Sequence, residues 1–430
     1  VEPSISTDSS GHIHMVHTAV SAVNGDGAIT GSSLMYTTNS SGSWSTIPID
    51  DVGWGGGSMA IDSNDKIHIA YQSGSDDYLK YATNVNGSWE TTHIQNADPD
   101  MSIGYSIAIF VDKNNHVHVS YANELNEVDP NYWGTKDNLL TYANNVEGFW
   151  NITEPAFQSS TISETSIVID SEMHVYIAYY YFDYILITHN NSEDGAWDSH
   201  HALTSASDKF SFDIDSQDVL HLLWGNNQLG YAYKSSDDLP SGSGYYWADT
   251  IIDSNLGYYG GQNSMTIDSR DNLHVAYYDD TELSIKSAIM KDNGVWNFSS
   301  IESVSKIDAY YSSIDIAVEH NGNAHIFYQT WQWSDAGSSE ALMKYSKISY
   351  LDLDGDGIKY IFDKCPDINP FEFDLDGDGC VDDDDNDGIR NGLDKCEGHD
   401  DSIDIDQDEI VDGCDDLIDN DGDGVANNLD

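Results

Sequence analysis

Basic residues are scarce in this chain. Among 430 residues, Lys and Arg number 16 against 75 Asp and Glu, so the formal net charge is −59 and the pI is about 4.1. Binding to nucleic-acid phosphates needs a basic surface, and the composition therefore disfavours a nucleic-acid partner. Long apolar runs are missing as well, so we predict no membrane span.

Cysteine is also rare. The chain has four Cys, all within its last 80 residues. Paired Cys residues, together with the Asp-rich loops described below, indicate an oxidising, calcium-rich exterior. We therefore expect an extracellular or cell-surface protein, with a signal peptide already removed because the chain starts at Val1 rather than Met. Five Asn-x-Ser/Thr triplets are candidates for glycosylation: Asn39, Asn86, Asn151, Asn190 and Asn297.

A six-residue spacing between an acid and a His recurs through the first 330 residues. The pairs are Asp8/His14, Asp62/His68, Asp112/His118, Asp215/His221, Asp268/His274 and Glu319/His325. A seventh copy keeps the spacing but has Tyr176 six residues after Asp170. The acidic positions recur every 45 to 58 residues, which is typical of a repeat architecture in which each copy is one supersecondary unit.

Each unit contains four short runs of alternating apolar residues. A Ser or small residue opens the first run, as at Ser58, and the His opens the second, which ends in an aromatic such as Tyr71. The third run ends in Tyr, as at Tyr81, and the fourth begins at a Trp after a Gly turn, as at Trp89. Such alternation predicts strands, and four strands per unit are typical of a propeller blade. The seven units predict an all-β, seven-bladed β-propeller over residues 1–350.

The repeated His residues are predicted to be structural. A residue present six times cannot be a single general base, and a buried polar group must be paired, so we expect each His to bridge a buried Asp and a backbone group. The His, Asp, Ser and Trp of each unit resemble the hydrogen-bonded tetrad of WD-repeat propellers, in a different chain order. The whole repeat resembles that of secreted bacterial and archaeal propellers, which implies the fold and says little about function.

The last propeller unit is incomplete. The sequence holds seven copies of the first three strands but six Gly-Trp fourth strands, and too few residues precede the first strand to complete a blade. We predict that blade seven has three strands or takes its outer strand from another molecule. The alternative is that Lys347–Leu351 curls back as a short fourth strand.

From Leu351 onward the composition changes. Residues 351–430 hold 29 Asp and Glu against 4 Lys and Arg, too acidic a balance for an apolar core. The pattern Asp-x-Asp-x-Asp occurs five times, is followed by Gly in four copies and by Glu409 in the other, and has Asp at its twelfth position each time. Acids at loop positions one, three, five and twelve with Gly at six suit calcium, and no room exists for the flanking helices of an EF-hand. We predict several Ca²⁺ ions, held by Asp352, Asp354, Asp356, Asp363, Asp374, Asp376, Asp378, Asp383, Asp385, Asp387, Asp394, Asp404, Asp406, Asp408, Asp415, Asp419, Asp421, Asp423 and Asp430.

These loops resemble thrombospondin type 3 repeats, in which Asp-rich loops follow one another in tandem. Asp-Lys-Cys-Pro at Asp363–Pro366 and a second Asp-Lys-Cys at Asp394–Cys396 add to the resemblance. It implies an irregular segment over residues 351–430, stabilised by calcium and by the disulfides Cys365–Cys380 and Cys396–Cys414. Because Glu409 and Glu397 depart from the pattern, we predict that the loop starting at Asp404 is the weakest.

Binding residues are expected on one face of the propeller. The loops after the second and fourth strands share this face and vary in length, and variable loops on a rigid scaffold often carry function. Exposed aromatic residues there would form an interface or a sugar platform, with packing over the blades as the alternative. The candidates are Trp54, Tyr132, Trp133, Tyr258, Tyr259, Tyr310, Tyr311, Trp331 and Trp333.

Three functions fit these features. The leading hypothesis is a non-catalytic extracellular protein, such as an adhesion, surface-layer or filament component, whose partners are other proteins or further copies of the chain. The second is a carbohydrate-binding propeller whose partners are glycans. The third is an enzyme such as a polysaccharide lyase or glycosidase, for which no spacing links the non-repeated candidates, and we predict no enzymatic activity. Those candidates are Glu124, Glu127, His189, His200 and His201.

Overall fold

The computed structural model describes most of the propeller and scattered residues of the acidic segment. The described residues are 3–23, 29–52, 56–74, 78–96, 98, 100–128, 136–158, 162–191, 195–204, 209–235, 247, 249–257, 260–290, 294–303, 313–320, 322–333, 339–349, 358, 363–365, 369–370, 374, 379–383, 389–391, 393–394, 396, 399, 402–404, 410–411 and 414–415. The chain divides into two compact units, Val1–Ile348 and Ser349–Asp430, each described by itself below.

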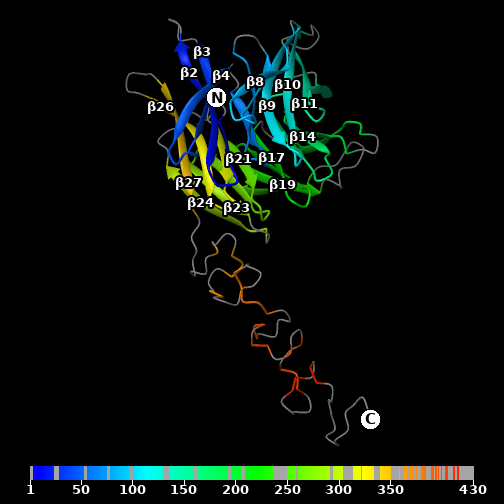
Figure 1. Cartoon of the computed structure of the whole chain (residues 1–430), viewed down its shortest axis with the longest axis vertical. Helices are drawn as coiled ribbons and strands as arrows, with labels where there is room; N and C mark the ends of the chain where they lie inside the picture. The colour runs from blue at the N-terminus through cyan, green and yellow to red at the C-terminus, as the bar shows by residue number, and fades with distance from the viewer. Residues whose placement is uncertain are drawn as a thin grey trace, which may run out of the picture. The chain divides into compact units, whose positions relative to one another are not determined.

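The first unit is the expected seven-bladed β-propeller (Figure 1). Every blade is an antiparallel sheet of strands that follow one another in the chain, with the first strand of each innermost. Blades 1 and 2 contain β1 (Ser4–Thr7), β2 (Ile13–Val23), β3 (Ile29–Thr38), β4 (Ser45–Asp51), β5 (Gly57–Ile61), β6 (Ile67–Gln72), β7 (Leu79–Thr83) and β8 (Glu90–Gln95). Blades 3 and 4 contain β9 (Met101–Val111), β10 (Val117–Val128), β11 (Lys136–Asn144), β12 (Asn151–Gln158), β13 (Thr165–Ile169), β14 (Val175–Tyr181), β15 (Tyr184–His189) and β16 (Asp198–Thr204).

The last three blades follow the same order. Blades 5 and 6 contain β17 (Lys209–Ile214), β18 (Val219–Gly225), β19 (Leu229–Ser235), β20 (Asp249–Asp253), β21 (Asn263–Ile267), β22 (Leu273–Asp279), β23 (Ser284–Met290) and β24 (Trp296–Ser303). Blade 7 contains β25 (Ile314–Val318), β26 (Ala324–Trp333) and β27 (Ser339–Ile348), and within the described residues it has three strands where the other blades have four. The prediction of a three-stranded seventh blade is confirmed to that extent.

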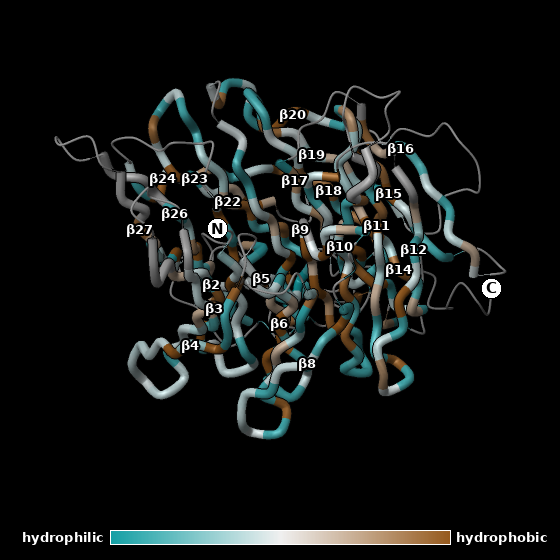
Figure 2. The backbone as a smooth tube through the Cα atoms, turned by 90° about the horizontal axis from the view of Figure 1, so that it is seen from above, coloured by the Kyte–Doolittle hydropathy of each residue, from teal (hydrophilic) through white to brown (hydrophobic). Residues whose placement is uncertain are grey.

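The apolar core lies between the blades. Apolar residues recur along the strands (Figure 2), and they form seven clusters of buried side chains, each shared by two neighbouring blades. The cluster that joins blade 7 to blade 1 is the smallest and consists of Ile5, Ile13, Met15, Ala317 and Phe327. The ring is thus closed by packing, and among the described residues its closing seam buries the fewest apolar side chains.

The repeated acid and His hold each blade together. In blade 2, Nε2 of His68 lies 3.4 Å from Oδ2 of Asp62, and Nδ1 lies 2.5 Å from the hydroxyl of Tyr81. The same arrangement surrounds His14, His118, His221 and His325. The structural role is therefore confirmed, but the expected backbone partner is wrong. The register pairs His68 with Thr83, which brings Tyr81, two residues earlier on the same face, within reach of the ring.

Blade 4 exchanges two members of this arrangement. Tyr176 occupies the His position and donates its hydroxyl to Oδ2 of Asp170 at 3.0 Å. Its cross-strand partner is His189, which stacks on the Tyr176 ring with 5.8 Å between centroids. The one copy of the repeat that lacks a His thus supplies it from the neighbouring strand.

The repeated Trp residues link neighbouring blades. Trp150 of blade 3 packs edge-on against Tyr81 of blade 2, with ring centroids 5.3 Å apart. Trp44 of blade 1 packs in the same way against Tyr345 of blade 7, also at 5.3 Å. This contact crosses the closing seam. In each of the other Tyr–Trp pairs, the Trp comes from the blade that follows the blade of the Tyr. At the seam, blade 1 supplies the Trp to blade 7. The expected tetrad is corrected accordingly, since the Trp contacts the Tyr of the preceding blade rather than completing a His-Asp-Ser set.

Ser hydroxyls join several of the innermost strands. Oγ of Ser58 accepts the backbone N–H of Ile109 in the next blade at 3.3 Å, and Oγ of Ser211 accepts that of Met265 at 3.0 Å. Blade 7 has Asp315 at this position, four residues before Glu319, where most units have Ser. Its Oδ1 accepts the Ser264 hydroxyl of blade 6 at 2.7 Å, and its Oδ2 accepts the backbone N–H of Ile5 of blade 1 at 2.9 Å. Asp315 therefore bridges the blades on both sides of blade 7.

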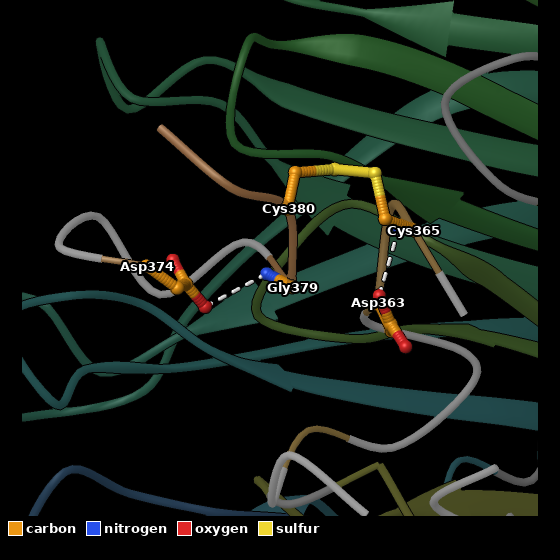
Figure 3. The surroundings of a disulfide bond; sticks show 5 residues. All are labelled: Asp363, Cys365, Asp374, Gly379 and Cys380. Carbon is orange, nitrogen blue, oxygen red and sulfur yellow. Dashed lines mark hydrogen bonds between the residues drawn. A yellow bond between two sulfur atoms is a disulfide. The ribbon is translucent and has the colours of Figure 1, made fainter. Parts of the chain in front are cut away.

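The second unit has no strand or helix among its described residues. Its two disulfides join Cys365 to Cys380 and Cys396 to Cys414, the pairing that the resemblance implied. Figure 3 shows the first disulfide beside Asp363 and Gly379. Two disulfides fit an oxidising environment outside the cytosol.

Candidate functional site

Hydrogen-bonded clusters of Tyr, acid and Lys recur where two blades meet. At the junction of blades 1 and 2, Asp50 at the end of β4 accepts the Tyr71 hydroxyl at 2.6 Å and pairs with Lys80 at 2.9 Å. At the junction of blades 6 and 7, Glu302 accepts the Tyr328 hydroxyl and pairs with Lys344 at 2.7 Å. Their recurrence indicates that these clusters hold the blades together.

The junction of blades 5 and 6 departs from this pattern. Tyr277 still donates to Asp253 at 3.0 Å, but Lys286 lies 4.0 Å from Asp253 and is turned toward two further carboxylates. It pairs with Asp279 at 2.6 Å and with Glu282 at 3.0 Å. Blade 2 has Ser73 at the position of Asp279, two residues after the Tyr. The Asp279 carboxylate is therefore absent from blade 2, whereas the position of Glu282 is acidic there too, as Asp76.

The turn between β22 and β23 fixes these carboxylates. Oδ1 of Asp279 accepts the backbone N–H groups of Thr281 and Glu282 at 2.9 and 3.0 Å, and the Thr281 hydroxyl at 2.6 Å. Asp279 is thus buried and saturated with donors, because its other oxygen binds Lys286. Glu282 has a side chain that is 63% exposed, so its carboxylate is the most accessible of the three.

A hollow opens beside this cluster. It is lined by Ile252, Asp253, Tyr277, Glu282, Lys286, Phe298, Ser299 and Ser300. Phe298 lies on β24, opposite Ala288 of β23, and is 48% exposed. In blade 2 the corresponding residue, opposite Ala82, is Thr91. The hollow therefore combines an exposed aromatic ring, two Ser hydroxyls and fixed charges, and Phe298 and Asp279 differ from the corresponding residues of blade 2.

The electrostatics of the hollow follow from these contacts. Burial acts to raise the pKa of Asp279, but hydrogen bonds from Lys286 and Thr281 outweigh it and the pKa is lowered. Burial acts to lower the pKa of Lys286, but its bonds to Asp279 and Glu282 outweigh it and the pKa is raised. Burial and then the Asp253 charge raise the pKa of Tyr277. The cluster is therefore three carboxylates against one ammonium group.

The close approach of blades 5 and 6 depends on two glycines. A Cβ on Gly225, the last residue of β18, would lie 2.0 Å from the carbonyl oxygen of Gly261, which precedes β21. Gly261 has a φ of +95°, a conformation that favours glycine. The two glycines thus allow the backbones to meet at the junction that carries the hollow.

The aromatic residues predicted for the binding face cannot be compared with the hollow. Seven of them lie outside the described residues: Trp54, Tyr132, Trp133, Tyr258, Tyr259, Tyr310 and Tyr311. Trp331 and Trp333 lie on β26, opposite Ala341 and Ser339, and their side chains are likewise outside the description. Strand directions nonetheless place Asp253 and the β22–β23 turn on the expected face. Sequence reasoning missed Phe298, Glu282 and Lys286, and of these only Phe298 departs from its counterpart in blade 2, a signal that could have identified it.

The non-repeated residues considered for catalysis do not converge in the described structure. His189 and His200 stack inside blade 4 with centroids 4.8 Å apart, and both are buried. His201 packs edge-on against Tyr184 at 4.9 Å. Glu124 and Glu127 lie on β10 of blade 3, and the Glu127 side chain is outside the described residues.

The stacked His pair predicts a loss of stability in acid. Burial and then the neighbouring His200 lower the pKa of His189 to about 4, so below pH 6.5 the unfolded chain takes up a proton that the folded protein resists. The contribution of His189 to the free energy of unfolding is therefore complete above pH 6.5. It falls by about 2 kcal/mol as the pH drops to about 4, after allowance for solvent screening. Urea unfolding at pH 7 and pH 5 should show this, and His189→Phe should reduce the difference. An unchanged difference in the variant would contradict it.

Among the described residues, two carboxyl groups on innermost strands change the free energy of unfolding with pH in the opposite sense. Burial raises the pKa of Asp213 to about 7 and that of Asp315 to about 6, so their contribution weakens as the pH rises toward those values. They titrate equally in the wild type and in His189→Phe, and the comparison between the two proteins therefore isolates His189.

Of the nineteen predicted calcium ligands, thirteen lie outside the described residues, and the six within them are Asp363, Asp374, Asp383, Asp394, Asp404 and Asp415. Among described residues no group of three or more His, Cys, Asp or Glu could hold a metal. Asp374, the first position of the second loop, accepts the backbone N–H of Gly379 at 2.9 Å. Asp363, the twelfth position of the first loop, is 1% exposed, and its Oδ1 would lie 2.1 Å from a Cβ on Gly379 (Figure 3). Carboxylates of two successive loops thus both lie beside one glycine, and carboxylate oxygens are ligands that Ca²⁺ prefers.

The glycosylation candidates differ in their surroundings. Asn86 and Asn151 are exposed, and the Asn86 amide donates to Glu90 at 3.0 Å. Asn39 and Asn190 use their Oδ1 atoms to accept the N–H groups of Ile13 and Val175 at 2.8 and 2.7 Å. Asn297 is part-buried on β24. The triplets remain candidates, and two of them also serve the fold.

Comparisons with known proteins bear on the fold. No protein-family model matches the sequence, and no curated protein does. Among solved structures, a protein of unknown function from Dyadobacter fermentans is 13% identical, with a TM-score of 0.42 over 69% of this chain and 92% of its own. The polysaccharide lyase Uly1 is 10% identical (TM-score 0.46, 80% and 89% covered), and the Hadza microbial sialidase Hz136 is 12% identical (TM-score 0.44, 70% and 71% covered). Such likenesses concern the fold alone and support no enzymatic assignment.

The leading functional hypothesis is corrected by this comparison. Matched structures whose names state an activity include a microbial sialidase, two polysaccharide lyases and a peptidase, and none of these four is named as an adhesion, surface-layer or filament protein. In the part of the chain that the structure describes, no helix has the length and apolarity needed to cross a membrane.

Proposed function

We propose that the propeller binds carbohydrate in the hollow at the junction of blades 5 and 6, and that it does so as an extracellular protein. The observation that carries the proposal is the exposed Phe298 ring beside Ser299, Ser300 and Glu282. An apolar ring can cover the apolar face of a sugar, and hydroxyl and carboxylate groups can bind its hydroxyls. Among the described residues, the clusters around Asp50 and Glu302 have neither the exposed ring nor a carboxylate that corresponds to Asp279, which supports a role beyond blade packing.

Replacing Phe298 by Ala should weaken sugar binding about tenfold, because burying a Phe side chain contributes on the order of 1.5 kcal/mol or more. A glycan array with neutral, amino and acidic oligosaccharides would identify the ligands, and isothermal titration calorimetry would compare the variants. Phe149→Ala is the matched control, since Phe149 is 59% exposed and lies in the turn before β12 of blade 3. Equal binding by wild type and both variants would remove the hollow as the site.

We also propose that the acidic unit binds several Ca²⁺ ions, with Asp363 and Asp374 among the ligands. The support is that a carboxylate from loop position twelve and one from loop position one both lie beside Gly379, since oxygen ligands at these loop positions suit Ca²⁺. Calcium would supply the charge balance that lets this apolar-poor segment fold. We infer from the position of Asp363 beside Gly379 of the second loop that successive loops would share ligands.

A further inference from the structure

We propose that the sugar taken by the hollow is an amino sugar carrying a protonated amine, an inference that rests on the proposed carbohydrate binding. Asp253, Asp279 and Glu282 give three negative charges, and Lys286 gives one positive charge. The charge that a ligand meets is therefore negative. Uronate or sulfate groups would be repelled, and an ammonium group would be attracted.

The arrangement of the three carboxylates shows which of them can meet the ligand. Lys286 makes its shortest contact with Asp279, which is buried and also accepts three bonds from its own turn. That pair is internally satisfied. Asp253 accepts the Tyr277 hydroxyl and lies 4.0 Å from the Lys286 nitrogen, with a side chain that is 23% exposed. Glu282 pairs with Lys286 at 3.0 Å, but its side chain is 63% exposed at the accessible rim. Both line the hollow, so an ammonium group between them would make charge-assisted hydrogen bonds.

The rest of the chain acts in the same direction. With two Arg residues in the whole sequence, Arg270 and Arg390, it offers no cluster of guanidinium groups for a sugar carboxylate or sulfate. The formal charge of −59 also disfavours a polyanionic glycan at a distance. This long-range term is screened over roughly 8 Å at physiological salt, so binding measured there reports mainly the charges of the hollow itself.

The test compares three short oligosaccharides of equal length, made of glucosamine, N-acetylglucosamine and galacturonate, by titration calorimetry of the whole chain in calcium at 0.15 M salt. We expect the glucosamine oligomer to bind about tenfold more tightly than the acetylated one, and the galacturonate oligomer not to bind, because one favourable charge contact of this kind amounts to about a factor of ten. Glu282→Gln should remove most of the preference for the amine. Glu147→Gln, which removes the same charge from an exposed position in blade 3, should leave it unchanged.

The outcomes separate the ligand class from the site. If Glu282→Gln and Glu147→Gln reduce the preference equally, the amine is held by the overall charge and the inference fails. If the galacturonate or acetylated oligomer binds best and Phe298→Ala removes that binding, the proposed site stands while the amino-sugar inference is overturned. If no oligosaccharide binding responds to Phe298→Ala, both fail.

Discussion

Asp315→Ala should destabilise the propeller more than any comparable change on another innermost strand. The substitution removes the acceptor for the Ile5 N–H of blade 1 and for the Ser264 hydroxyl of blade 6. Each donor left without an acceptor costs about 1–3 kcal/mol. The variant no longer buries a carboxylate, so part of the cost of that burial is recovered. The same burial raises the pKa of Asp315 to about 6. We therefore expect a net loss of about 2 kcal/mol at pH 7, measured as the shift of the urea midpoint.

The matched control is Ser58→Ala, at the equivalent position of blade 2. Ser58 accepts one N–H at 3.3 Å, so its loss should cost less than about 1 kcal/mol. Asp315→Asn keeps the shape and one acceptor, and it should fall between the two. If Asp315→Ala costs no more than Ser58→Ala, the seam between blades 7 and 1 is held by packing alone, through Phe327 and its neighbours.

Removing calcium should expose the acidic unit to protease and leave the propeller intact. The segment from Ser349 onward has few apolar residues, so its order depends on metal and disulfides rather than on a core. Limited proteolysis with a chelator should cleave this segment at least about tenfold faster than with calcium, because a metal that binds the folded form alone stabilises it by mass action. Mass spectrometry should then find a protected fragment ending near Ile348.

Two measurements keep this prediction specific. The thermal unfolding of the propeller, followed by Trp fluorescence, should not change with chelator, because all eleven Trp lie before Ser349. Asp374→Ala should speed cleavage even in calcium, since Asp374 is a predicted ligand that also binds the Gly379 N–H. Equal cleavage with and without chelator would contradict the proposal that metal orders the segment.

Much of the fold could be predicted because the repeat shows it many times. Seven acid positions and six Gly-Trp strands predicted seven blades and a three-stranded last blade, and the structure agrees within the described residues. The His–Tyr pairing could not be predicted, because it depends on the register that sets His68 opposite Thr83. The contact between Trp44 and Tyr345 joins residues about 300 positions apart and follows only from ring closure.

The candidate site was harder to predict for a different reason. Lys286 reads as an ordinary strand residue, and Asp253 belongs to another blade, so their proximity appears only when the blades pack. Phe298 reads as one more apolar residue of an outer strand. Comparison of the blades with one another would have marked Phe298, Asp279 and Asp315 as departures from a repeated position. In this chain the repeated residues explain the fold, and the departures mark the site and the closing seam.

The proposed site can be tested most directly by a crystal structure of the whole chain with a bound glucosamine oligomer. The account predicts a sugar ring stacked on Phe298, hydroxyl groups bonded to Ser299 or Ser300, and the amine between Asp253 and Glu282. Sugar bound elsewhere on the propeller, with the hollow between blades 5 and 6 empty, would contradict it.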